Sequence, residues 1–193
     1  MLLINAIPAV SDSYWYLKPT VGLSQMNDTS GTSTNIGTID GAIDIELDSG
    51  FTPGIAIGKK FNENWSADFA WEDRTNDSET TIADGTFFNE GNYASSVFSF
   101  NGYYHFNSAS KWTPYVGAGL MLGQEIDIDL ELNGEELSYS NDGETGFQLM
   151  LGSYYEIDKN WAFNGDLRYG QFSSIDLEGE GNNGLINGLD YEL

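Results

Sequence analysis

The residues most suggestive of chemistry in this sequence are carboxylates that alternate with apolar side chains in three stretches. These stretches are IDIELDSG (43–50), EIDIDLEL (125–132) and SIDLEGEG (174–181). Side chains of an extended strand point alternately to its two faces, so each stretch would place its carboxylates on a single face. Carboxylate oxygens are hard ligands of the kind that Ca²⁺ prefers. The function of the acids therefore depends on which face they occupy.

Carrying the alternation along each strand predicts that these acids point inward. Ile43, Ile45 and Leu47 would then share the outward face with Phe51. Successive inward carboxylates would lie about 6.6 Å apart, with neighbouring strands about 4.8 Å away. The predicted cation-attracting rim consists of Asp44, Glu46, Asp48, Asp127, Asp129, Glu131, Asp176 and Glu178.

Two interpretations of this rim stay open. Carboxylates from two strands could hold Ca²⁺ weakly, or the rim could simply be a solvated anionic surface. None of the three stretches has the Asp- and Asn-rich, Gly-centred spacing of a dedicated calcium loop. A β-bulge near Gly123 or Gly170 would reverse the faces.

Four tryptophans divide the chain into repeated units. Trp15, Trp65, Trp112 and Trp161 recur at intervals of 50, 47 and 49 residues. A regular period of this length indicates a repeated supersecondary unit. Apolar residues follow each Trp at every second position, which is typical of strands rather than helices. Each unit also contains a returning strand, so four units give eight strands.

The connections between these strands differ at the two ends. Short turns, such as NEN and DKN, lead from each returning strand to the next Trp. The other ends carry polar stretches that we expect to be long loops, roughly residues 27–49, 74–92, 124–145 and 173–184. This asymmetry is typical of outer-membrane barrels, in which aromatic residues form girdles at the bilayer surfaces. The four tryptophans are the predicted girdle on the short-turn side.

The sequence thus predicts an all-β fold, an eight-stranded antiparallel up-and-down transmembrane β-barrel. We expect the barrel domain to span residues 14–193, with 1–13 a signal-peptide remnant or a disordered N-terminus. The closing strand is expected in LINGLDYEL, residues 185–193.

The interior of such a barrel is narrow and is filled by side chains. One face of the predicted strands is rich in glycine and in charges of both signs, whereas the other carries large apolar groups. A soluble barrel would place its apolar face inside, but here the small, charged face fits the narrow lumen better. Unpaired buried charges are costly, so we expect a lumen ion-pair network of Lys18, Lys60, Asp68, Glu72, Arg74, Glu156, Asp166 and Arg168.

Composition excludes several classes of function. With no Cys, the chain has no thiolate metal site and no thiol nucleophile. Its formal net charge of −23 argues against nucleic acid as a partner. The single histidine, His105, has Ser108 and Ser110 nearby in sequence, yet a polar lumen role fits it better than catalysis. No catalytic residue and no cofactor is predicted.

Two stretches carry a family resemblance. YYHFNSASKWTPYVGAGL (103–120) and YYEIDKNWAFNGDLRYGQFSSIDL (154–177) resemble small eight-stranded outer-membrane proteins of the OmpA-like, opacity-like and OmpW-like groups. The resemblance implies an integral protein of the Gram-negative outer membrane. Its partners would be membrane lipid and lipopolysaccharide, with the barrel-assembly machinery acting during insertion. The ending LDYEL departs from the terminal Phe usual in the family, and no extra OmpW-like final strand is found.

The sequence favours a non-enzymatic protein with a structural or surface-interaction role through acidic extracellular loops. The alternative is a narrow channel for small or hydrophobic solutes, as the OmpW-like resemblance would imply. A third class, a lipid A-modifying enzyme, would need a nucleophile and base clustered at the outer leaflet. The surface ligand and the oligomeric state stay open.

Overall fold

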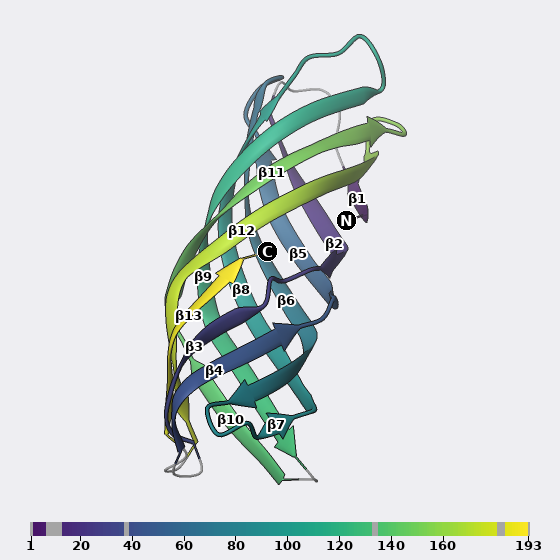
Figure 1. The fold of residues 1–193 in the computed structure, drawn as a ribbon. Coiled ribbons are helices and arrows are strands. Elements are labelled where there is room, and N and C mark those ends of the chain that lie inside the picture. The colour runs from purple at the N-terminus through teal and green to yellow at the C-terminus, as the bar shows by residue number, and fades with distance from the viewer. Residues whose placement is uncertain (1, 7–12, 37–38, 133–134, 181–183, 193) are drawn as a thin grey trace.

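The computed structural model describes residues 2–6, 13–36, 39–132, 135–180 and 184–192, and these form a tall cylinder of strands (Figure 1). The described residues contain no helix long and apolar enough to cross a membrane. The strands are β1 (Leu2–Ala6), β2 (Tyr14–Ser24), β3 (Thr29–Ile36), β4 (Ile39–Leu47), β5 (Gly50–Lys60), β6 (Trp65–Ile82), β7 (Phe87–Phe88), β8 (Glu90–His105), β9 (Trp112–Leu132), β10 (Glu135–Asn141), β11 (Glu144–Glu156), β12 (Trp161–Gly179) and β13 (Leu185–Glu192).

The predicted fold class is confirmed: the strands close into an eight-stranded antiparallel barrel. Seven positions around the wall belong to β2, β5, β6, β8, β9, β11 and β12, each paired with its neighbours. Two short strands share the eighth position. Near the short turns β1 pairs with both β12 and β2, and farther along β13 pairs with β12 and β3.

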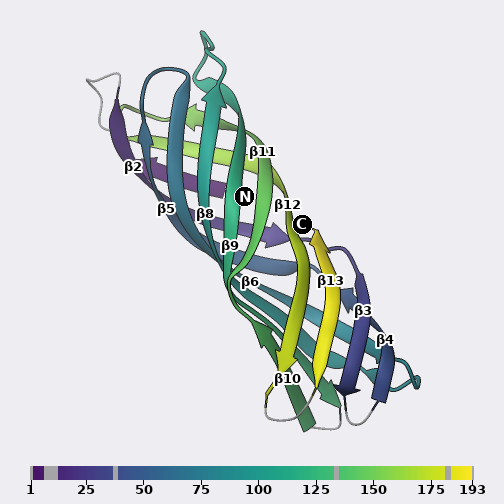
Figure 2. The same cartoon turned by 90° about the vertical axis from the view of Figure 1, so that its left-hand side faces the viewer.

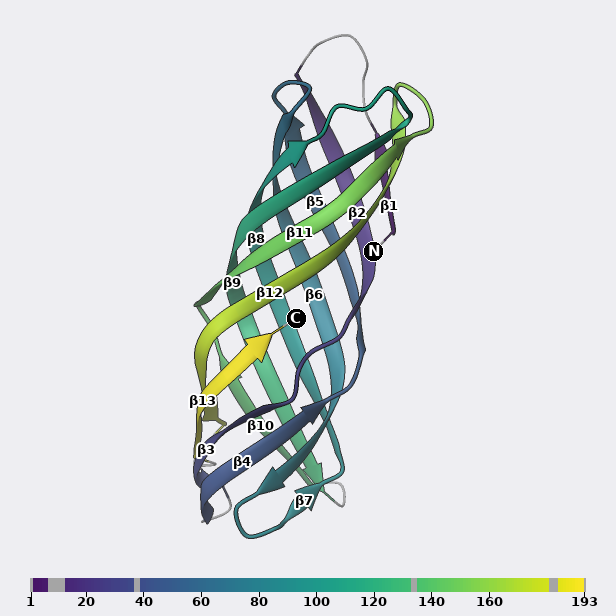
Figure 3. The same ribbon diagram turned by 45° about the horizontal axis from the view of Figure 1, so that its top comes forward.

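This shared position differs from the expected boundaries. The sequence prediction placed Leu2–Ala6 outside the barrel, but the structure includes this segment in the sheet as β1, beside β2 (Figure 3). The predicted closing strand 185–193 corresponds to β13, which ends at Glu192, and Leu193 lies outside the described residues.

The four stretches expected to be loops are largely strand. β6, β9 and β12 contain 18, 21 and 19 residues, about twice the 9–11 that cross a membrane. Their far halves, with β3, β4, β7, β10 and β13, continue the cylinder beyond the short-turn half (Figure 2). We call this far half the extension. The loop prediction was wrong because polar residues that alternate with apolar ones can cover the outside of a sheet.

The half next to the short turns has an apolar exterior, which we call the belt. Leu23 and Leu167, for example, are 86% and 77% exposed. Most of its outward side chains are large and apolar: Trp15, Leu17, Val21, Leu23, Phe51, Ile55, Ile57, Trp65, Phe69, Trp71, Phe100, Trp112, Val116, Leu120, Leu122, Phe147, Leu149, Leu151, Trp161, Phe163, Leu167 and Tyr169. The inner face of the belt is polar, as the sequence predicted for strands that cross a membrane.

At the boundary between belt and extension, the pattern of inward and outward residues inverts. On β9 the register against β8 shifts between Ser96 and Val97, so that Gln124 and Glu125 are both exposed. On β12 the register against β13 shifts between Phe172 and Ile175. The third change falls at Asp48 and Ser49, between β4 and β5. On β9 and β12, a bulge inserts one residue into the strand and exchanges its faces.

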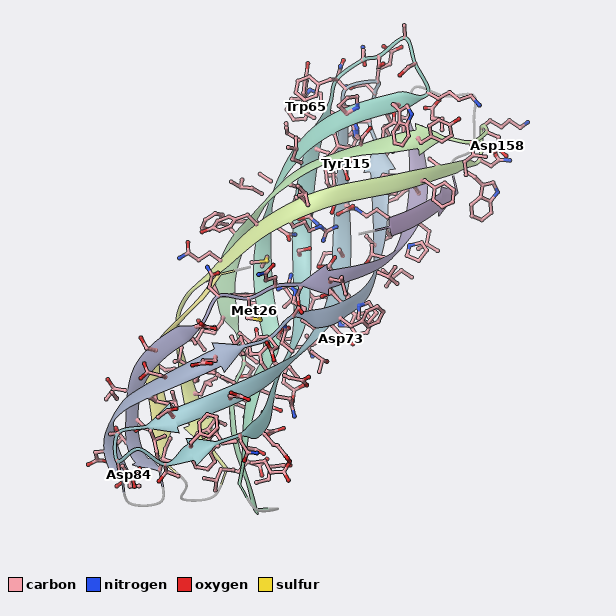
Figure 4. The ribbon with its side chains drawn as sticks, turned by 45° about the vertical axis from the view of Figure 1, so that its right-hand side comes forward. Met26, Trp65, Asp73, Asp84, Tyr115 and Asp158 are labelled. Carbon is pink, nitrogen blue, oxygen red and sulfur yellow. The ribbon has the colours of Figure 1, made fainter. Side chains whose placement is uncertain are left out.

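Because of these shifts, the extension has an apolar core. Ile43, Ile45, Ile126, Ile128 and Leu130 are fully buried. The cluster around them also contains Met26, Ile36, Leu47, Ile82, Phe88, Tyr93, Val97, Met121, Tyr139, Phe172, Ile175, Leu177, Ile186 and Leu189. Figure 4 shows Met26 near the middle of the cylinder and Asp84 at the far end of the extension.

The predicted orientation of the acidic rim was therefore wrong. Its members lie on the outer surface of the extension, some exposed and some half-buried: Asp44, Glu46, Asp48, Asp127, Asp129, Glu131, Asp176 and Glu178. The prediction assumed that inward and outward residues alternate without interruption across the boundary. One inserted residue exchanges the two faces. β6 has no such shift, so Asn76, Ser78 and Thr80 continue its polar inner row into the extension.

Two single-residue deletions test the bulge on β9. Deleting Gln124 removes the extra residue and leaves Ile126, Ile128 and Leu130 inward, so the barrel should still fold. Deleting Asp127 turns Ile128 and Leu130 outward and Asp129 inward, which should cost several kcal/mol. Heat-modifiable migration on gels after refolding checks both variants. Equal damage from the two deletions would contradict the bulge.

Candidate functional site

A buried ion pair lies at the centre of the belt lumen. Lys18 on β2 and Asp68 on β6 approach to 2.5 Å between Nζ and Oδ2, and their side chains are 3% and 0% exposed. The other carboxylate oxygen of Asp68 accepts hydrogen bonds from Asn101 Nδ2 at 2.9 Å and Tyr103 Oη at 3.3 Å. Lys18 Nζ also donates to Tyr103 Oη at 3.0 Å. The pair thus has the additional hydrogen bonds that a buried charge pair requires.

A second charged group lies deeper in the barrel. Arg168 on β12 forms ion pairs with Glu72 on β6 and, at 3.0 Å from Nε to Oδ1, with Asp166. Arg74 contacts Glu72 at 3.5 Å, and Tyr115 Oη donates to Asp166 Oδ2 at 2.8 Å. The residues on β6 and β12 meet across the lumen, because an eight-stranded barrel is narrow enough for opposite walls to touch.

Neutral residues extend these two groups around the wall. Gln148 Nε2 on β11 donates to Asn101 Oδ1 at 2.7 Å, and Asn101 in turn donates to Asp68. Asn101, Tyr103, Tyr115 and Gln148 were not predicted as part of the network. Their inward parity on β8, β9 and β11 was the available signal, but the predicted network contained only charged residues. With them, six strands are bonded together through the lumen.

Two predicted members lie elsewhere. Lys60 lies at the short-turn end, where its Nζ donates to Tyr154 Oη at 2.8 Å. Glu156 is exposed at the same end. The ion pairs described in this structure join the other six predicted residues, so the network is shorter than expected.

The girdle tryptophans lie at the short-turn end with their rings outward. Trp15, Trp65, Trp112 and Trp161 are 62, 52, 56 and 46% exposed. Trp65 packs edge-on against Tyr104 with ring centroids 5.0 Å apart (Figure 4 labels Trp65), and Trp112 lies 4.9 Å from Tyr155.

The similar sequences FNENW and IDKNW have a common geometry. Asn62 Oδ1 accepts hydrogen bonds from the backbone N–H groups of Asn64 and Trp65, both at 2.9 Å. Asp158 Oδ1 accepts in the same way from Asn160 at 2.7 Å and Trp161 at 3.0 Å. A side chain that bonds the backbone two and three residues later closes a tight turn. The repeated motif therefore sets where β6 and β12 begin.

The outer surface of the extension concentrates like charges. The strand registers place Glu46 opposite Glu79, and Glu131 opposite both Glu136 and Glu90. Like charges directly opposite each other destabilise a sheet. Among the described residues, no group of three or more His, Cys, Asp or Glu is arranged to hold a metal ion. The calcium interpretation of the acidic rim stays a prediction.

Charge crowding also affects protonation. Partial burial, together with Asp129 and Glu125, raises the pKa of Asp127 to about 6. A carboxyl whose pKa is higher in the folded state than in the unfolded state stabilises the folded state at low pH. This stabilisation is lost as the pH rises through about 6. The extension is thus held together against its surface charge by its apolar core.

The sole histidine has a partner that the sequence did not suggest. His105 Nε2 lies 2.7 Å from Ser66 Oγ on β6. Ser108 and Ser110, its neighbours in sequence, bond to each other at 2.9 Å in the exposed turn.

Comparison with known proteins gives three matches. A family model described as the outer membrane protein beta-barrel domain matches residues 1–192. Protein opa of Haemophilus influenzae is 30% identical over 88 residues, which are 46% of this chain and 71% of that protein. The crystal structure of Neisserial surface protein A (NspA) aligns with 94% of this chain and 97% of its own, at 16% identity and a TM-score of 0.49.

The Lys18–Asp68 pair can be tested by a double-mutant cycle. Asp68→Asn leaves a buried ammonium without its counter-charge, and we expect it to lower the free energy of unfolding by about 3–5 kcal/mol. Adding Lys18→Met should recover most of that loss, because no buried charge then remains at the pair. Urea unfolding of the vesicle-inserted protein, followed by tryptophan fluorescence, measures both. Additive losses in the double variant would mean that the two residues are not coupled.

Proposed function

Because the chain belongs to the outer membrane protein β-barrel domain family, we propose that it is a closed, non-enzymatic barrel that acts at the cell surface. As a member it is an integral protein of the Gram-negative outer membrane. In such barrels the short turns face the periplasm and the longer segments face outward. The belt then lies in the bilayer and the extension projects from the cell.

The filling of the lumen supports a structural and surface role over a narrow channel. In the belt, the Lys18–Asp68 pair lies in the lumen and the Arg168–Glu72 pair crosses it between opposite walls. Above it, the apolar core of the extension fills the space that an aqueous path would need. A solute would have to separate paired charges and then pass through packed side chains such as Ile126 and Ile128, both fully buried. The two fillings of different chemistry, ion pairs in the belt and apolar side chains in the extension, are the observation that supports this proposal.

A non-enzymatic role is supported by the position of the one candidate base. Ser66 and His105 are 4% and 7% exposed and lie near the short turns. Lipid A occupies the opposite leaflet, so this pair is not placed to act on it. Nothing in the family match supplies a catalytic residue.

The charge distribution indicates the kind of partner. The seven basic residues are Lys18, Lys59, Lys60, Arg74, Lys111, Lys159 and Arg168, and all belong to the belt or the periplasmic turns. The extension therefore has acids and no Lys or Arg, on a rigid sheet rather than on loose loops. Such a surface attracts cationic ligands at low ionic strength. A basic surface of another molecule is the partner that it fits best.

Binding of a polycation to vesicle-inserted protein tests this role. We expect polylysine to bind, and binding to weaken as salt is raised from 20 to 500 mM, conditions that screen surface charge. The variant Asp127→Asn/Asp129→Asn/Glu131→Gln should bind several-fold more weakly. The control variant Glu63→Gln/Asp158→Asn removes two acids from the periplasmic turns and should bind like the wild type. Equal binding by both variants would contradict a role for the extension.

Planar-bilayer recording tests the closure separately. We expect no sustained conductance from the wild-type protein, because the ion-paired network and the apolar core both block the lumen. Arg168→Ala breaks the network, but the core above it remains, so only rare, small openings are expected. Steady single-channel currents from the wild type would favour the narrow-channel alternative.

A further inference from the structure

A small cavity lies at the periplasmic mouth of the lumen, below the ion-paired network. Its volume is about 40 Å³, and its lining includes Tyr14, Tyr16, Lys60, His105 and Tyr154. The lining also includes Tyr115, which is labelled in Figure 4. The cavity lies at the other end of the molecule from the acidic extension, and the surface role proposed above does not involve it.

The charge of the cavity lining is positive, in contrast to the chain as a whole. Lys18 and Lys60 contribute ammonium groups, and the described lining includes no carboxylate. Lys18 is paired with Asp68 behind the wall of the cavity. Lys60 has only phenolic and aromatic neighbours among its described contacts: Tyr154 Oη at 2.8 Å and the rings of Tyr154 and Tyr14 at 5.1 and 5.9 Å. Glu156 lies exposed at the same end but outside the lining.

His105 adds a buried polar atom to this lining. Its side chain is 93% buried, and its Nε2 is engaged by Ser66 Oγ at 2.7 Å. Its Nδ1 has no hydrogen-bond partner within the part of the chain that the structure describes. A buried ring nitrogen left without a partner is costly. The ring lines the cavity with its other atoms, because Nδ1 itself is fully buried.

We infer that this cavity is a binding site for a carboxylate group. The Lys60 ammonium provides a charge-assisted hydrogen bond, and the ring of His105 lies in the wall of the site. A water needs about 10–15 Å³ of such volume, so the cavity holds about three heavy atoms, which is the size of one carboxylate. The group can belong to a small acid or to the C-terminus of a periplasmic peptide.

Because His105 is the only histidine, its ¹⁵N imidazole resonances report on this site without ambiguity. Acetate is titrated into refolded, ¹⁵N-histidine-labelled protein at constant ionic strength. We expect a saturable shift of both ring nitrogens. Lys60→Met should weaken binding at least about tenfold, the usual effect of losing a charge-assisted hydrogen bond. Lys60→Arg, which keeps the charge, should retain most of it.

Lys59→Met is the matched control. Its ammonium lies outside the lumen, 5.5 Å from the ring of Trp15, so its loss should leave acetate binding unchanged. Failure of Lys60→Met to fold would leave the wild-type titration and Lys60→Arg as the test. A wild-type shift that does not saturate, or equal binding by Lys59→Met and Lys60→Met, would overturn the site.

Short N-acetylated peptides distinguish the two sources of the carboxylate. A peptide with a free C-terminus that binds more tightly than acetate, and loses its binding when amidated, identifies a peptide terminus as the ligand. Acetate binding without any gain from the peptide identifies a small acid. Both results support the site, and absence of binding by both probes overturns it.

Discussion

The structure depends on one constraint: a closed eight-stranded cylinder has a narrow interior, and its strands must suit two different surroundings along their length. In the belt, the outer face meets acyl chains, so large apolar residues point outward and polar ones fill the lumen. In the extension, the outer face meets water, so the arrangement must be opposite. A strand with strict alternation satisfies only one of these conditions. The register shifts near Gln124 on β9 and between Phe172 and Ile175 on β12 allow single strands to satisfy both.

This constraint explains why the interior has two chemically distinct fillings. Paired charges are suited to the belt because its inner face is polar, and the Lys18–Asp68 pair is stabilised by the neutral donors Asn101 and Tyr103. Above the boundary, the hydrophobic effect takes over, since water surrounds the extension and burying Ile43, Ile45 and Leu130 removes apolar surface from it. The apolar core in turn offsets the repulsion between outward acids such as Glu46 and Glu79.

The sequence was sufficient to predict the belt but not the extension. The tryptophan period and the alternation after Trp65 and Trp161 gave the strand count, and the girdle tryptophans were placed at the short-turn end. The two-residue period was also present in IDIELDSG and EIDIDLEL, and strands could have been predicted there. Their facing could not, because a bulge exchanges faces without altering composition, and its position depends on pairing with a neighbouring strand. The same limitation applies to the partners of His105, since Ser66 is distant in sequence and adjacent only through the β6–β8 register.

The separation of charge follows from the same two environments. Cations inside the belt must be paired, and Lys18, Arg74 and Arg168 have carboxylate partners. The others stand at the periplasmic end, where Lys59, Lys60 and Lys111 lie over the rings of Trp15, Tyr154 and Tyr155. Aromatic rings at a membrane surface hold such ammonium groups near the interface while their charges stay hydrated. With every basic residue committed to the belt or to this end, the extension keeps an unneutralised acidic surface. The surroundings of each half of the barrel therefore determine where the charges lie: basic groups in the belt and at the periplasmic end, and an acidic surface on the extension.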